Sequence, residues 1–215
     1  MLKIWGRRNS FNVQKVLWLA GELGLVYEHI PAGGDFGRLN EAEFRDLNPH
    51  GRVPLLQDGN IAVWESHAIL RYLGAKYGAD NFWPDDPAVR SQIDAWMDWT
   101  ETAFQPNFVN GIFWAYYRTP EAKRDWTLIR KNIRRCAEHL RLLDGIFAGR
   151  TYLAGETFSL ADIALGTLFY RYFQLDVERP SAPYAEAWYH RLEERSAYRE
   201  HVMTPFDDLY GRLAY

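Results

Sequence analysis

The chain has 215 residues, a formal net charge of −3, and 47% hydrophobic against 25% charged residues, the balance of an ordinary globular protein. That charge excludes the strongly basic surface typical of nucleic-acid-binding proteins. The single cysteine, Cys136, excludes an internal disulfide framework and a zinc site built on several thiolates. The histidines show no metal-ligand spacing, and neither a signal peptide nor a run of roughly 20 apolar residues is present. We therefore expect a cytoplasmic protein that uses no metal, nucleic acid or membrane.

The first 80 residues alternate between strand-like and helix-like patterns. In chain order, the patterns predict a strand at 2–5, a helix at 12–23, a strand at 26–32, a helix at 40–48, a hairpin of 53–58 and 61–65, and a helix at 65–78. Gly24 is expected to end the first helix and Asn40 to cap the second. This βαβ unit followed by αββα predicts a small mixed sheet with a right-handed crossover.

The spacing of apolar residues changes after Gly78, where two prolines and three aspartates mark a linker. From there on the apolar spacing is helical only, with one amphipathic face from Val89 onward, a second over 126–147, and shorter helices near 160–173, 184–194 and 204–213. The sequence thus predicts an α/β domain at 1–80, a linker at 81–87 and an all-α domain at 88–215.

Ser10 lies where the first strand gives way to a helix. Serine is a good helix cap, so capping is one interpretation of this position. The other is chemical, because an anion can settle against the free N–H groups of a helix start and accept a hydrogen bond from the hydroxyl.

Two further motifs invite both a structural and a functional interpretation. Pro54 begins a strand, where it fits an edge position as a trans proline, or follows a cis bond that would present the Val53 main chain to a ligand. Glu65 and Ser66 begin the helix at 65–78, where Ser66 could simply cap it. Alternatively the helix end would take a carboxylate and Glu65 an ammonium, which together suit an α-amino acid.

A fourth motif concerns folding. Ser159 and Asp162 have the spacing of a capping box, and Phe158 and Ile163 that of a hydrophobic staple. We therefore expect Asp162 to stabilise a helix start by about 1 kcal/mol, or more if it is buried.

In this order, the motifs S-x-N-V-Q-K-V, N-P-x-G-x-V-P, E-S-x-A-I and S-L-A-D-I-A resemble the cytosolic glutathione transferase superfamily over essentially the whole chain. The resemblance implies a thioredoxin-like N-terminal domain and an all-α C-terminal domain. It also implies a homodimer that binds glutathione, and a cis bond before Pro54.

The resemblance also assigns the glutathione-binding residues. Val53 would pair its main chain with the cysteinyl part. Ser66 and its helix end would take the γ-glutamyl carboxylate, and Glu65 the ammonium. Arg52 falls near the glycyl end, although a surface role is an alternative.

Ser10 matches the catalytic serine of the serine-type classes, which lowers the thiol pKa by donating to the thiolate. Asn12 stands where several of these classes have proline, so its amide is a possible second donor. Which of Ser10 and Asn12 matters more stays open. Cys136 lies on the apolar face of a long helix and is expected in the core.

The remaining assignments concern the helical domain. Asp98 occupies a place from which some bacterial members reach the neighbouring subunit's glutathione, although an exposed acid is the plainer interpretation. An acceptor pocket is expected between the domains, and at least half of its candidate walls are expected to be core residues. The candidates are Phe11, Phe104, Gln105, Phe108, Phe113, Trp114 and Tyr117.

The leading hypothesis is a glutathione transferase that attacks an apolar electrophile with glutathione thiolate. One alternative is a glutathione-dependent disulfide reductase or peroxidase, which Asn12 as the main sulfur partner would favour. The other is a non-catalytic binding or scaffold protein on the same fold, since a fold alone does not guarantee chemistry.

Overall fold

The computed structural model describes residues 1–78 and 82–213, and these divide into two compact units. Up to residue 85, and again over 196–204, the chain belongs to the first unit; 86–195 and 205–213 form the second. The predicted boundary between the first domain and the linker falls at 79–81, outside the described residues. The last two residues of the predicted helical domain, 214–215, also lie outside them.

The first unit is built on a four-stranded sheet. Its strands are β1 (Leu2–Trp5), β2 (Tyr27–Ile30), β3 (Leu55–Asp58) and β4 (Ile61–Trp64), in the order β2-β1-β3-β4. β1 pairs with β2 in parallel, and the β1–β3 and β3–β4 pairs are antiparallel. The predicted mixed sheet, hairpin and βαβ unit are confirmed.

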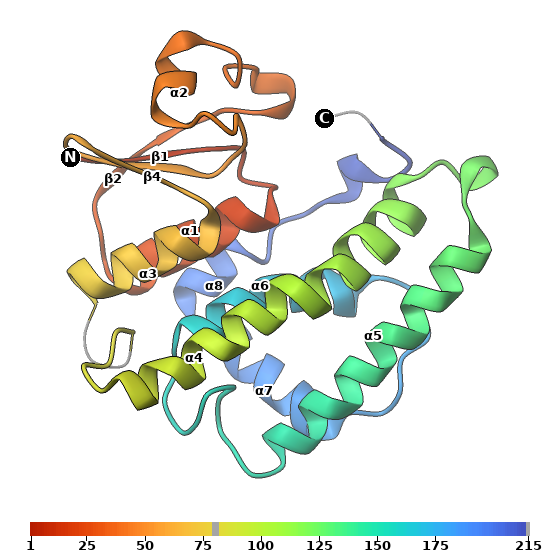
Figure 1. Ribbon diagram of the computed structural model, residues 1–215. Coiled ribbons are helices and arrows are strands. Elements are labelled where there is room, and N and C mark those ends of the chain that lie inside the picture. Colours follow the sequence, from red (N-terminus) through yellow and green to blue (C-terminus); the bar gives the residue numbers. More distant parts are fainter. Residues whose placement is uncertain (79–81, 214–215) are drawn as a thin grey trace. The chain divides into compact units, whose positions relative to one another are not determined.

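Helices cover both faces of this sheet (Figure 1). α1 (Phe11–Glu22) and α3 (Ser66–Tyr77) pack together on one face. On the other face, α2 (Ala42–Leu47) places Phe44 edge-on against Trp5, with ring centroids 5.9 Å apart. Gly24 has φ 61°, as expected for a residue that ends a helix in the left-handed region.

The predicted cap of the short helix is wrong. Glu41 occupies the N-cap position of α2, while Asn40 lies one residue earlier. The Asn40 Oδ1 instead accepts a hydrogen bond from Arg45 Nη2 at 2.8 Å. The amide therefore stabilises the loop through a side chain rather than through the free N–H groups of the helix.

The C-terminal prediction needs a second correction. The expected helix at 204–213 holds only a short 3₁₀ turn, η5 (Asp207–Leu209), because Pro205 and Gly211, with φ 65°, interrupt the chain. A helix that the pattern did not reveal precedes it, α8 (Ser196–His201). This helix packs on α1 in the first unit, where Tyr198 lies edge-on to Trp18 at 4.6 Å.

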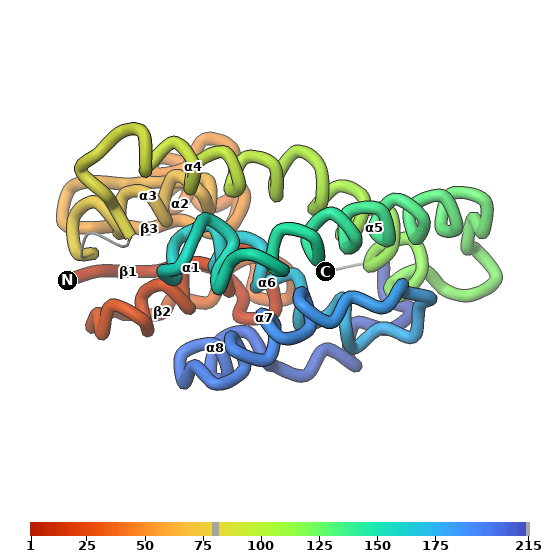
Figure 2. The backbone as a smooth tube through the Cα atoms, turned by 90° about the horizontal axis from the view of Figure 1, so that it is seen from below, coloured from red at the N-terminus to blue at the C-terminus, as the bar shows by residue number. Residues whose placement is uncertain are grey.

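The second unit is helical throughout. Besides η5, its elements are α4 (Pro87–Trp99), η2 (Thr100–Phe104), η3 (Pro106–Arg118), a short 3₁₀ turn, η4 (Glu121–Lys123), α5 (Trp126–Phe147), α6 (Leu160–Gln174) and α7 (Pro183–Glu193). α4, η2 and η3 form one continuous helix (Figure 2). Within the described residues, no helix is long and apolar enough to cross a membrane.

The C-terminal half of that continuous helix is wound more widely than an α-helix. η2 and η3 are π-helical, and a π-helix uses more residues in each turn than the 3.6 of an α-helix. Phe104, Phe108, Phe113 and Tyr117 are spaced by steps of about one such turn. Their rings follow one another at 5.9, 6.4 and 5.5 Å, so the wide turns align four aromatic side chains in a column.

Close packing between η3 and α5 depends on Gly111. A Cβ at this position would overlap the side-chain amide of Asn132, which is buried and donates to Leu128 O at 2.9 Å. We expect Gly111→Ala to lower the free energy of unfolding by about 1–3 kcal/mol through overpacking, measured by urea denaturation.

A matched control is Gly145→Ala on α5, since a Cβ there meets nothing within 4 Å. This substitution should leave stability unchanged or raise it by about 1 kcal/mol, because alanine is the better helix former. Equal effects of the two substitutions would contradict the packing argument.

The predicted capping box at the start of α6 is confirmed, and it reaches further than expected. Asp162 is fully buried and accepts from Ser159 N at 3.0 Å and from Ser159 Oγ at 3.2 Å. It also accepts from Leu153 N and from Trp188 Nε1, both at 2.9 Å. Burial raises the pKa of Asp162 to about 6, against these donors, so the carboxylate is ionised at pH 7.5.

Candidate functional site

The segments that carry the predicted site residues of the first unit all lie at the same end of the sheet strands. In the strand register, Trp5 is paired with Leu55, and Leu55 with Trp64. The loop to Ser10 follows Trp5, Pro54 precedes Leu55, and Glu65 follows Trp64. Three segments far apart in the sequence are therefore brought to one edge.

Gly6 allows two of these segments to approach each other closely. It has φ 151°, and a Cβ there would overlap a methyl group of Val13 and lie 3.3 Å from Val53 Cβ. Only a glycine fits, so the loop that carries Ser10 passes directly beside Val53.

Ser10 occupies the N-cap position of α1, but its side chain does not cap the helix. Its backbone is extended, with φ −85° and ψ 126°, and its carbonyl accepts from Gln14 N at 2.9 Å. The hydroxyl makes no hydrogen bond to the first turn. The half-buried hydroxyl thus stands at the positive end of the α1 dipole, where a ligand can use it.

Asn12 lies in the first turn of α1 and is half-buried. Its Oδ1 atom is buried and has no hydrogen-bond partner within the described part of the chain. A buried polar atom without a partner is uncommon and calls for an explanation. An amide that can be turned to present either oxygen or nitrogen to a ligand supplies one.

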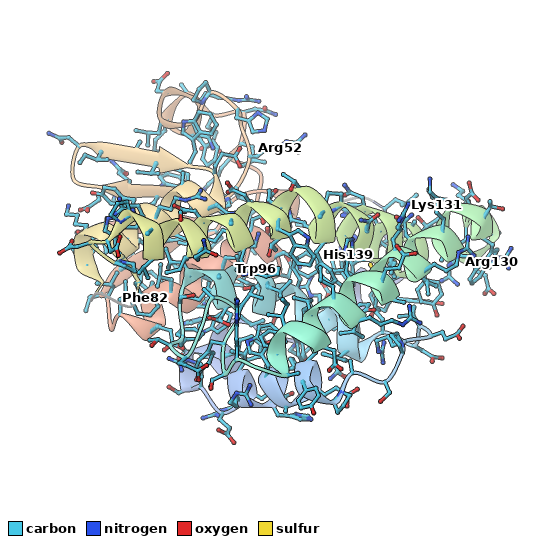
Figure 3. The ribbon with its side chains drawn as sticks, turned by 60° about the horizontal axis from the view of Figure 1, so that its bottom comes forward. Arg52, Phe82, Trp96, Arg130, Lys131 and His139 are labelled. Carbon is cyan, nitrogen blue, oxygen red and sulfur yellow. The ribbon has the colours of Figure 1, made fainter. Side chains whose placement is uncertain are left out.

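The Val53–Pro54 peptide bond is cis, as the resemblance implies. The loop before it is held by Asn48, whose Nδ2 donates to Arg52 O at 2.7 Å and whose Oδ1 accepts from His50 N at 3.0 Å. The Arg52 side chain is exposed at the surface of the first unit (Figure 3).

The start of α3 differs from the simple cap considered above. Glu65 is the N-cap residue and makes no side-chain cap bond, while Ser66 is the first helical residue and is 4% exposed. Capping by Ser66 is therefore wrong. Glu65 has φ 69°, and the only other non-glycine residue with positive φ in residues 1–78 and 82–213 is Arg38. Such strained backbone is concentrated at functional sites.

Sequence reasoning missed a buried polar pair behind these helix starts. Lys15 on α1 is fully buried, and its Nζ lies 3.2 Å from Nε2 of His67 on α3, which is 8% exposed. The one available signal was a lysine on the apolar face of a predicted helix.

The candidate acceptor residues of the second unit fall into two groups. Phe104, Phe108 and Phe113 are buried, the first two against Tyr172 at 5.7 and 5.3 Å. These three side chains are core residues. Trp114 and Tyr117 are half-buried, as is Gln105, whose Nε2 donates to Glu101 at 2.7 Å. Phe11 belongs to the first unit, where it is 8% exposed.

Asp98 is exposed on α4, and its carbonyl accepts from Thr102 Oγ1 at 2.8 Å. Cys136 is fully buried, and burial raises the pKa of its thiol to about 12, which makes it an inert core residue. No group of three His, Cys, Asp or Glu side chains in the described residues could hold a metal ion.

Comparison with known proteins identifies this arrangement. The family models for the N-terminal and C-terminal domains of glutathione S-transferase match residues 1–75 and 104–196. The chain is 40% identical over 207 residues to glutathione S-transferase GstB of Escherichia coli, covering 95% of this chain and 99% of that protein. It is 30% identical over 214 residues to glutathione S-transferase 3 of Zea mays, covering 94% and 93%.

A solved structure agrees with these relatives. The theta class glutathione S-transferase of Xanthomonas axonopodis pv. citri, crystallised with glutathione bound, superposes with a TM-score of 0.89 at 46% identity, covering 95% of this chain and 98% of that one. The chain belongs to the glutathione S-transferase family, and the predicted fold class is confirmed.

Proposed function

We propose that the protein is a glutathione transferase, which binds glutathione in the first unit, activates it as the thiolate and conjugates it to an apolar electrophile. The observation that carries this proposal is the Ser10 hydroxyl, which stands at the start of α1 and makes no capping bond. The family membership supplies glutathione as the co-substrate.

The proposed binding mode takes its assignments from the family resemblance, and it is supported by the position of these residues at one end of the sheet. The γ-glutamyl carboxylate lies against Ser66 and the free N–H groups of the α3 start, and the ammonium pairs with Glu65. The main chain of Val53 pairs with the cysteinyl part. The exposed Arg52 guanidinium attracts the glycyl carboxylate.

The chemistry requires little of the protein beyond positioning and anion stabilisation. A thiol with a pKa of about 8.5 is only a few per cent ionised at pH 7, and a nearby helix N-terminus with a hydrogen-bond donor lowers that pKa. Ser10 is the proposed donor to sulfur, and Asn12 a second one. The sulfur lone pair then forms a C–S bond, the leaving group departs with its bonding electrons, and the thiol proton is lost to solvent.

The helical unit supplies the acceptor surface. Trp114, Tyr117 and Gln105 are the partly exposed candidates there. The buried Phe104, Phe108 and Phe113 support that surface from behind. We also propose a cytoplasmic homodimer in which the exposed Asp98 reaches the neighbouring subunit's γ-glutamyl group.

Glu65→Gln tests the ammonium contact, because it removes the charge but keeps the shape and the strained backbone. Loss of one charge-assisted hydrogen bond should raise the glutathione Kd about tenfold in calorimetric titration. Glu43→Gln, an exposed acid in the first turn of α2, is the control and should bind like the wild type. An unchanged Kd for Glu65→Gln would remove Glu65 from the site.

Turnover assays separate this proposal from its alternatives. With reduced glutathione, an activated aryl halide should be conjugated faster than a small disulfide or a hydroperoxide is reduced. The opposite ranking would favour the reductase or peroxidase, with Asn12 as the main sulfur partner. No binding at millimolar glutathione would favour the scaffold protein.

A further inference from the structure

The buried pair of Lys15 and His67 joins the two helices that carry the proposed glutathione site. Lys15 lies five residues after Ser10 on α1, and His67 directly follows Ser66 on α3. Their side-chain nitrogens are 3.2 Å apart, and neither side chain is more than 8% exposed. The contact therefore connects the start of α3 to α1 from the interior of the unit.

The protonation state of His67 is defined by its surroundings. Burial, together with the positive charges of Lys15 and Arg71, lowers the pKa of His67 to about 2. The imidazole is neutral at neutral pH, so Nε2 accepts a hydrogen bond from the Lys15 ammonium and Nδ1 carries the proton.

Packing alone does not explain such a pair. The buried side chains of α1 and α3 are mostly apolar, and Val16, Ile69, Leu70 and Leu73 among them are fully buried. Burying an ammonium group is costly unless it is hydrogen-bonded, and apolar side chains of similar volume hold helices together without that cost. What a directional hydrogen bond adds is one fixed geometry between the helices.

We propose that Lys15 and His67 are positioning residues for the γ-glutamyl end of glutathione. Their hydrogen bond fixes the first turn of α3 against α1, so that Ser66 and the free N–H groups of that turn are held in place before the carboxylate arrives. Preorganised polar groups bind more tightly because less freedom is lost on binding. This inference rests on the proposed function, since it concerns the same ligand.

Substitution of His67 provides the test. His67→Leu removes the acceptor at similar volume, while His67→Gln keeps an acceptor oxygen. The Kd is measured for S-hexylglutathione and for its analogue without the γ-glutamyl α-carboxylate, each by calorimetric titration. His67→Leu should weaken S-hexylglutathione about tenfold or more, since small misplacements of positioned groups have effects of this size. The analogue should be weakened less than twofold, and His67→Gln should bind both ligands nearly as the wild type does.

A matched control lies at the other end of α3. Lys76→Met likewise breaks a hydrogen bond between a lysine and an acceptor on another element, here Asp58 of β3, but far along α3 from Ser66. It should leave both Kd values unchanged.

Three results would overturn the inference. One is an equal loss of affinity for both ligands in His67→Leu, which indicates a general structural role. The second is an unchanged Kd for S-hexylglutathione in His67→Leu. If His67→Leu does not fold, the equivalent result is a His67→Gln variant that no longer binds S-hexylglutathione. The third is a wild type that binds neither ligand, which also refutes the proposed function and is thereby distinguished from the first two.

Discussion

Asp162→Ala should lower the free energy of unfolding by about 3–6 kcal/mol. The substitution leaves the N–H groups of Leu153, Ser159 and Trp188 buried without their acceptor, and each such loss is worth about 1–3 kcal/mol. The effect exceeds the value of about 1 kcal/mol for an ordinary cap, because this one carboxylate joins the loop before α6, the start of α6 and a side chain of α7. Urea denaturation at pH 7.5, followed by circular dichroism, measures it.

Asp125→Ala is the comparison. Asp125 also caps a helix, accepting from Thr127 N and Leu128 N at 2.9 and 3.0 Å, but it is exposed. Asp125→Ala should lower the free energy of unfolding by about 1 kcal/mol, since water can replace the carboxylate. If Asp162→Ala were no more destabilising than Asp125→Ala, the buried hydrogen bonds of Asp162 would not contribute the proposed stability.

Ser10→Ala should lower kcat/KM about 100- to 1000-fold, the usual effect of removing one donor to a developing or bound anion. The loss should appear in kcat, because the hydroxyl contacts the sulfur and not the parts of glutathione that hold it in place. Initial rates with an activated aryl halide at saturating glutathione measure this.

Stability distinguishes this prediction from a capping role. Replacing a capping serine with alanine costs about 1 kcal/mol, but the Ser10 side chain makes no capping bond, so Ser10→Ala should unfold like the wild type. Asn12→Ala is the parallel variant. A greater loss of kcat in Asn12→Ala than in Ser10→Ala would transfer the main role to the amide.

The fold could be predicted where the signal is local. The mixed sheet, the hairpin and the capping box at Ser159 follow from alternation, turn residues and spacing within a few residues, and all are present. The prediction of a helix at 204–213 is wrong because it followed the apolar spacing and disregarded Pro205. The aromatic column from Phe104 to Tyr117 could not be predicted, since a search for a 3.6-residue period does not find residues aligned by wider turns.

The candidate site depended on a different kind of signal. Pro54 as a cis residue and the assignment of Glu65 and Ser66 depended on the resemblance to a family, whereas the residue patterns alone favoured a trans bond and a cap. The positive φ of Glu65 has no signature in its own residue type. The contact of Lys15 with His67 spans 52 residues along the chain, and only the packing of α1 on α3 brings the two side chains together.

The most direct test of the central claim is the ultraviolet difference absorbance of glutathione thiolate on the wild-type protein, titrated across pH. We predict a thiolate signal that appears with a pKa well below the value of about 8.5 for a free thiol, and that is reduced in Ser10→Ala. Glutathione that binds but ionises only near its free pKa would contradict the proposed activation at the start of α1.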